Sequence, residues 1–111
     1  MRLVIIESPY AGDVAANVAY ARECVRDALK RGEAPIASHL LFTQPGILRD
    51  DVPEERALGI AAGLAWRKVA DASVFYTDRG WSQGMVSAYQ AAQLSDAPIE
   101  LRALHGEVQL P

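Results

Sequence analysis

Four short apolar runs, separated by stretches with helical periodicity, constrain the fold of this chain more than any other feature. The runs are 2–7 (RLVIIE), 34–38 (APIAS), 73–77 (SVFYT) and 98–102 (PIELR). Each is short and bounded by turn residues, as is typical of β-strands. Strands that alternate with helices predict parallel pairing through right-handed crossovers. We therefore expect a single domain over residues 1–111, an α/β fold with three α/β/α layers around a parallel four- to five-stranded sheet.

Three helices are predicted between these strands, and each has a recognisable boundary. Asp13 and Ser82 are typical N-cap residues, Pro53 suits a first helical turn, and Gly32 suits a helix stop. The predicted helices cover residues 13–31, 53–69 and 83–94. Residues 39–51 lack regular periodicity, so a structured loop is expected there, and the last nine residues show no clear pattern.

Charge and cysteine content narrow the possible partners. The net charge of −3 disfavours binding along a nucleic-acid backbone, although a few local donors can still hold a small phosphorylated ligand. The single cysteine, Cys24, excludes an internal disulfide and indicates a reducing compartment, so a cytoplasmic protein is expected. No apolar run approaches the roughly 18–20 residues that span a bilayer, and no membrane partner is expected. With one well-placed histidine and one mid-helix cysteine, no metal site and no cofactor are predicted.

The carboxyl edge of the predicted sheet is where a ligand is expected. The loops 8–13, 39–51 and 78–83 all lie on that edge. In the first loop, SPYAGD, the Ser8 hydroxyl and the following amides form a candidate anion cradle at a helix N-terminus. The alternative is a plain strand-to-helix turn shaped by Pro and Gly.

Other polar and aromatic residues on this edge have similar alternatives. His39 contacts a base, a ribose hydroxyl or a phosphate, or else holds its loop in place. Asp78 binds a ribose hydroxyl or acts as a lone acid, or else forms a turn, and Trp81 stacks on a base or packs in the core. Ser82 caps its helix and also offers a phosphate contact. The candidate ligand-binding residues are Ser8, Tyr10, Ala11, Gly12, Asn17, His39, Asp78, Trp81, Ser82, Gln83 and Gly84, and the only catalytic candidate among them is Asp78.

Three motifs in this order, IIESPYAGD, SHLLFTQ and YTDRGWSQGM, resemble the nucleoside 2-deoxyribosyltransferase superfamily, and more narrowly small phage and bacterial proteins of that fold. The resemblance spans about residues 2–103 and implies a flavodoxin-like or Rossmann-like sheet. It also implies cleavage or transfer of an N-glycosidic bond by a Glu four residues after the Gly that matches Gly84, assisted by an Asp in the preceding helix. In this chain those two positions carry Ala88 and Gly63.

We therefore predict binding of a nucleotide or nucleotide-derived small molecule without the usual chemistry, as in a phage-type protein that sequesters a signal in the host cytoplasm. The alternative is an N-glycosidase or deoxyribosyltransferase acting on deoxynucleoside 5′-monophosphates, in which Asp78 or Glu7 replaces the missing acid. A homo-oligomer is also expected, because the Ala-rich run at 57–66 (ALGIAAGLAW) would let two backbones approach closely.

Overall fold

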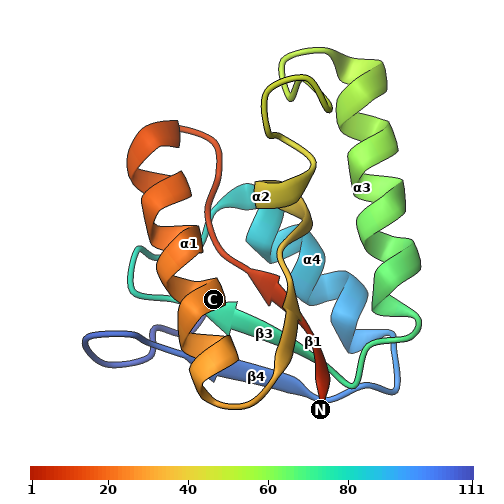
Figure 1. Ribbon diagram of the computed structural model, residues 1–111. Helices are drawn as coiled ribbons and strands as arrows, with labels where there is room; N and C mark the ends of the chain where they lie inside the picture. Colours follow the sequence, from red (N-terminus) through yellow and green to blue (C-terminus); the bar gives the residue numbers. More distant parts are fainter.

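The computed structural model covers residues 1–111 and contains one four-stranded parallel sheet, in the order β2-β1-β3-β4 (Figure 1). The strands are β1 (Leu3–Glu7), β2 (Ala34–Ile36), β3 (Ala72–Tyr76) and β4 (Ile99–Arg102). In the register of the sheet, Ile5 of β1 lies between Ile36 of β2 and Ser73 of β3. The predicted α/β class and parallel sheet are confirmed.

Three of the four helices begin where the sequence predicts. They are α1 (Val14–Lys30), α2 (Ser38–Leu41), α3 (Pro53–Arg67) and α4 (Gln83–Gln93). Asp13 accepts a hydrogen bond from the amide of Ala16, and Ser82 accepts one from the amide of Met85. Pro53 occupies the first turn of α3, whose N-cap, Val52, provides no side-chain cap. Local capping chemistry therefore sets the start of α1 and α4.

The connection after β2 differs from the prediction. β2 ends at Ile36 rather than at 38, and Ser38–Leu41 form the one-turn helix α2 inside the stretch expected to be a loop. The amide of Leu41 donates to the carbonyl of Ala37, and the amide of Phe42 donates to that of Ser38. A helix of four residues is too short to show apolar periodicity, which is why the sequence pattern missed it.

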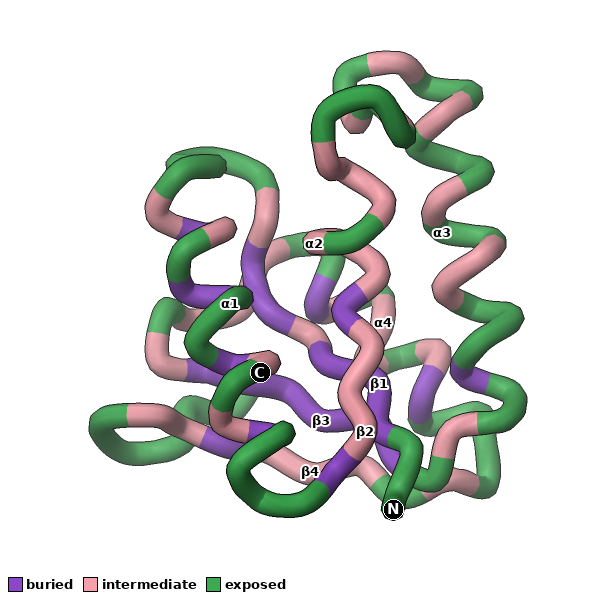
Figure 2. Tube along the Cα trace, viewed as in Figure 1, coloured by how far each residue is buried: buried purple, intermediate pink, exposed green.

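The two faces of the sheet bury different side chains. Val4, Ile6, Val74 and Tyr76 point toward α1 and form the larger core cluster with its side chains. On the opposite face, Phe75 packs with residues of α4 in a smaller cluster. This alternation follows from the two-residue period of a strand, and the buried residues in Figure 2 lie mainly along the central strands.

Two segments are held by few buried residues. In α3, only Arg67 is buried, and Figure 2 shows most of that helix as exposed or partly exposed. The segment after β4 contains no helix or strand, but the amide of Gln109 donates to Thr77 Oγ1, so this tail folds back to the end of β3. No helix is both long enough and apolar enough to cross a bilayer.

Candidate functional site

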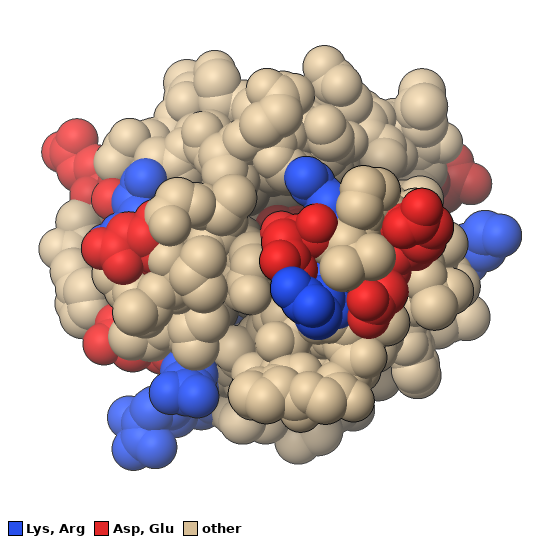
Figure 3. Space-filling view, turned by 90° about the horizontal axis from the view of Figure 1, so that it is seen from above, with Lys and Arg blue, Asp and Glu red and all other residues tan.

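The candidate site lies where β1 and β3 end side by side. The chain leaves β1 toward α1 and leaves β3 toward α4, so the two connections diverge around a switch point of the kind that holds ligands in open parallel sheets. Seen from above (Figure 3), this side of the molecule is hollowed near its middle, and acidic and basic side chains are interspersed on it. The mixed charges provide local contacts rather than a continuous basic surface.

The SPYAGD loop presents backbone donors at this edge. Ser8 is buried, whereas Ala11 and Gly12 are exposed, and the amides of Ala11 and Gly12 donate to no acceptor in the protein. Gly12 has a φ of 101°, a conformation that favours glycine, and nothing lies within 4 Å of a Cβ placed on it. The loop can therefore offer two free N–H groups to an anion.

Asn17 holds this loop in place from the first turn of α1. Its Nδ2 donates to the carbonyls of Tyr10 and Ala11 at 3.0 and 3.1 Å. Its Oδ1 accepts a hydrogen bond from Arg79 Nε at 2.9 Å, which links the loop after β1 to the loop after β3. The polar atoms of Asn17 are thus engaged within the protein, and the side chain fixes the shape of both loops.

Ser8 and His39 form a close pair across the edge. Ser8 Oγ lies 2.6 Å from His39 Nε2, so the hydroxyl after β1 meets the imidazole carried by α2. Burial lowers the pKa of His39 to about 4, so the ring is neutral at pH 7. Its other nitrogen, Nδ1, is buried and has no hydrogen-bond partner in the protein. A buried ring nitrogen without a partner is costly unless a ligand or water supplies one.

Asp78 is occupied by structural contacts. Its carboxylate accepts hydrogen bonds from the Tyr20 hydroxyl at 2.6 Å and from the amides of Leu104 and His105 at 2.8 and 2.9 Å. Burial opposes ionisation, but these hydrogen bonds outweigh it and lower the pKa of Asp78. A carboxylate held ionised by this many donors is poorly suited to act as a general acid, and it anchors the C-terminal tail instead.

Trp81 belongs to an aromatic cluster. Its ring stacks on Phe75 with centroids 5.3 Å apart and planes 23° apart, and it forms a T-shaped pair with Tyr89 with centroids 5.4 Å apart. Its Nε1 donates to the carbonyl of Gln109 in the tail. The ring is therefore packed against α4. This arrangement matches the second of the two alternatives given for Trp81, packing in the core.

The start of α4 offers further donors. Ser82 Oγ accepts from the amide of Met85, and the Ser82 carbonyl accepts from Val86. The amides of Gln83 and Gly84, in the first turn, donate to no acceptor in the protein, so they remain available to an anion at the positive helix end.

Gly63 and Ala88, the two positions at which the resemblance implies carboxylates, lie around one arginine, Arg67, that the sequence pattern did not single out. Arg67 donates through one NH2 group to Glu7 Oε1 at 2.7 Å and through the other to the carbonyl of Ala88 at 2.7 Å. Gly63 lies one turn before Arg67 on the same helix. Burial raises the pKa of Glu7 to about 7 despite the neighbouring guanidinium. The sequence does contain a pattern that points to Arg67. Arg67 is a charged residue four positions after Gly63, so the two residues share one face of the helix.

Gly63 permits a close approach between α3 and α2. A Cβ on Gly63 would lie 2.9 Å from Ser38 Oγ, closer than side chains tolerate. Ser38 precedes His39, and His39 contacts Ser8, which follows Glu7 in the chain. Two side-chain hydrogen bonds, Ser8–His39 and Glu7–Arg67, thus lie next to each other at the end of β1.

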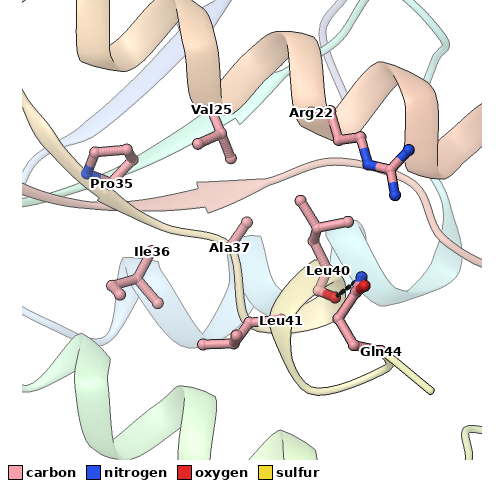
Figure 4. A pocket seen from close by; sticks show the side chains of 8 residues that line it. All are labelled: Arg22, Val25, Pro35, Ile36, Ala37, Leu40, Leu41 and Gln44. Atoms are coloured by element: carbon pink, nitrogen blue, oxygen red, sulfur yellow. Dashed lines mark hydrogen bonds between the residues drawn. The ribbon is translucent and has the colours of Figure 1, made fainter.

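An apolar hollow lies elsewhere. It measures about 340 Å³ and lies between α1, β2 and α2, with Val25, Ile36 and Leu40 among its lining residues and Arg22 at one end (Figure 4). Gln44 Nε2 donates to the carbonyl of Leu40 at its rim. The hollow borders the outer edge of β2 rather than the SPYAGD loop, and none of the candidate ligand-binding residues lines it. No group of three or more His, Cys, Asp and Glu side chains is arranged to hold a metal ion.

Comparisons with known proteins agree with this architecture. A family model described as "Domain of unknown function (DUF7768)" matches residues 2–102. Among solved structures, the chain is similar to a 2-deoxyribosyltransferase from the psychrotolerant bacterium Bacillus psychrosaccharolyticus, described as a biocatalyst for the synthesis of nucleosides. The TM-score is 0.66 at 19% identity, and the match covers 97% of this chain and 77% of the other. The fold is thus deoxyribosyltransferase-like. None of the curated proteins compared with the chain matches it.

Proposed function

We propose that this chain, which belongs to the family described as "Domain of unknown function (DUF7768)", binds a nucleotide or a nucleotide-derived small molecule at the carboxyl edge of its sheet. The observation that carries the proposal is the pair of free amides at Ala11 and Gly12 beside the buried Ser8 hydroxyl. These donors lie at the divergence of the β1 and β3 connections, and α4, which follows β3, has free first-turn amides of its own. Backbone donors at this place suit a phosphate group.

His39 gives the proposed ligand a second contact. Its ring is neutral, and one buried nitrogen lacks a partner, so a base or a ribose hydroxyl can complete its hydrogen bonding. The proposed orientation places the phosphate on the SPYAGD loop and the base toward α2. Trp81 is the proposed stacking partner for a base, although Phe75 already covers one face of its ring.

The proposed activity is binding without bond cleavage. Gly63 and Ala88 provide no acid or nucleophile where the resemblance implies two carboxylates. We place the chain with small phage and bacterial proteins of this fold, and a retained pocket without those carboxylates suits a protein that sequesters a nucleotide-derived signal. Binding the signal without cleaving it would be enough for sequestration.

Calorimetric titration tests this proposal. The purified chain is titrated with nucleoside monophosphates, cyclic nucleotides and ADP-ribose derivatives, and at least one is expected to bind. Gly12→Ala should weaken that binding at least about tenfold, or about 1.4 kcal/mol, because alanine disfavours the φ of 101° that orients the free amides. Gly32→Ala is the matched control, since Gly32 has a φ of 81° and open space around it but lies at the far end of α1. Absence of binding to every compound at millimolar concentration would refute the proposal.

A second candidate function is cleavage of the N-glycosidic bond of a deoxynucleoside 5′-monophosphate, and the position of Glu7 favours it. The carboxyl group of Glu7 shares Arg67 with the backbone of Ala88, so it lies near the position that carries the expected Glu. A pKa of about 7 allows this group to give and take a proton near neutral pH. Asp78 lacks that freedom because its oxygens are hydrogen-bonded within the protein.

Base release from deoxynucleoside monophosphates, followed over hours, tests the second candidate. Glu7→Gln should abolish base release and leave the binding measured by calorimetry in place. Asp78→Asn should still release base, because it leaves the carboxyl group of Glu7 unchanged. If the unaltered protein releases no base, the second candidate fails and the binding proposal stands.

A further inference from the structure

Helix α3 exposes an apolar surface that nothing in the chain covers. Its ten residues 57–66 carry no charge, yet Leu58 is 61% exposed and Leu64 is 43% exposed. Ala57, Ala61 and Ala65 beside these leucines are exposed as well. A helix that is apolar around most of its circumference is normally buried, and a contiguous exposed apolar surface marks an interaction site.

The inner face of α3 is easily identified. A Cβ on Gly59 would meet Leu48 at 3.3 Å, Gly63 abuts Ser38, and Arg67 is the buried residue of the helix. These three positions recur every four residues and therefore share one face. The opposite face, defined by helical spacings of three and four residues, consists of exposed residues only: Glu54, Ala57, Leu58, Ala61, Leu64, Ala65 and Lys68. We call these seven residues the outer face of α3.

The outer face of α3 is self-complementary when reversed about its centre. Ala61 is the central residue, and positions at equal distances on either side of it have matching chemistry. Glu54 corresponds to Lys68, Leu58 to Leu64, and Ala57 to Ala65. Two antiparallel copies of the helix would thus pair acid with base at both ends and Leu with Leu on both sides, with alanine at the centre.

We propose that α3 packs against α3 of a second copy of this chain, antiparallel, about a two-fold axis near Ala61. A two-fold interface must be complementary to itself, and the charge order of the outer face meets that condition. Spacings of three and four residues with small residues in the middle allow close packing of helices at a shallow angle. Neither Glu54 nor Lys68 forms an ion pair within the chain, so both remain available across the interface.

The dimer would also fix the wall of the candidate site. Arg67 lies on the inner face of α3 and holds Glu7 and the backbone of Ala88. Because α3 has one buried residue of its own, a partner on the outer face would hold the helix, and hence Arg67, in position. One helix face is smaller than the roughly 800 Å² per partner of a stable complex, so we expect a dissociation constant in the micromolar range.

Sedimentation equilibrium of the full chain tests the proposal. The unaltered protein should show a mass twice its 12.0 kDa at high micromolar concentration. Ala61→Glu places two like charges together at the axis and should raise the dissociation constant more than about 100-fold. Glutamate is a good helix former, so this variant should remain folded by circular dichroism. The matched control is Ala15→Glu, in the exposed first turn of α1, which should leave the dimer intact.

A charge exchange tests the antiparallel direction. Glu54→Lys alone should weaken the dimer, and adding Lys68→Glu should restore it, because the two ends then pair with the opposite sign. A monomeric unaltered protein at high micromolar concentration would overturn the proposal. So would a dimer that survives Ala61→Glu, a control variant that dissociates equally, or a double exchange that does not recover.

Discussion

Replacing Glu7 with glutamine should change how the stability of the protein depends on pH. The pKa of Glu7 is raised from 4.5 to about 7 by burial, so ionisation of this carboxyl group disfavours the folded state. The favourable contribution of the protonated group is complete below pH 4.5 and is lost as the pH rises toward 7. At about 1.4 kcal/mol per pH unit, the total loss is about 3 kcal/mol. Glutamine does not ionise, and its side-chain oxygen can still accept the hydrogen bond from Arg67.

Urea unfolding of the two proteins between pH 4.5 and pH 8 measures this effect. The free energy of unfolding of the unaltered protein, relative to Glu7→Gln, should fall by about 2–3 kcal/mol over that range. Glu107→Gln makes the same chemical change at an exposed position in the tail and should show no such divergence. A constant difference between the unaltered protein and Glu7→Gln across the range would refute the assignment of a shifted carboxyl group to Glu7. It would also remove the proton exchange near neutral pH on which the second candidate function depends.

Three further changes probe the contacts around the site. Gly63→Ala should change the free energy of unfolding by less than about 1 kcal/mol, because the contact of its Cβ with Ser38 Oγ at 2.9 Å offsets the higher helix propensity of alanine. In a Ser38→Ala background, where that oxygen is gone, the same change should be more stabilising in a double-mutant cycle measured in urea. Asp78→Asn should cost about 1–3 kcal/mol and speed proteolytic cleavage within residues 103–111, followed by mass spectrometry, because the tail amides lose their carboxylate acceptor. Ser82→Ala should cost about 1 kcal/mol in urea unfolding through loss of the α4 cap.

The fold could be predicted because its signals are local. The four apolar runs, the caps at Asp13 and Ser82 and the proline at 53 each depend on a few neighbouring residues, and all appear in the structure near their predicted positions. The short helix α2 could not be predicted, since its four residues contain less than two turns of periodic pattern. The run of uncharged residues at 57–66 indicated an apolar helix surface, and in the structure α3 exposes that surface.

The contacts of the candidate site could be predicted only in part. The sequence placed Ser8 and His39 on the same edge, but their 2.6 Å contact depends on the order of β2 and β1 and on the turn of α2. The pairing of Glu7 with Arg67 joins residues 60 positions apart and depends on how α3 lies against the sheet. Such contacts between distant segments depend on how the helices pack against the sheet. The helix and strand propensities of neighbouring residues do not predict that packing.

The residues at the two positions where the resemblance implies carboxylates fit their surroundings in this structure. Gly63 leaves room for Ser38, and through it α2 can carry His39 to Ser8; an aspartate at 63 would occupy that room. Arg67, one turn later, then finds its carboxylate partner in Glu7 rather than in helix α4, where residue 88 is alanine. The acidic group nearest to these two positions through Arg67 thus belongs to the sheet, beside the SPYAGD loop. Calorimetry and base release with the same Glu7→Gln protein therefore separate the two functions: binding that persists while cleavage stops assigns Glu7 to chemistry, and binding without any cleavage assigns the whole edge to capture.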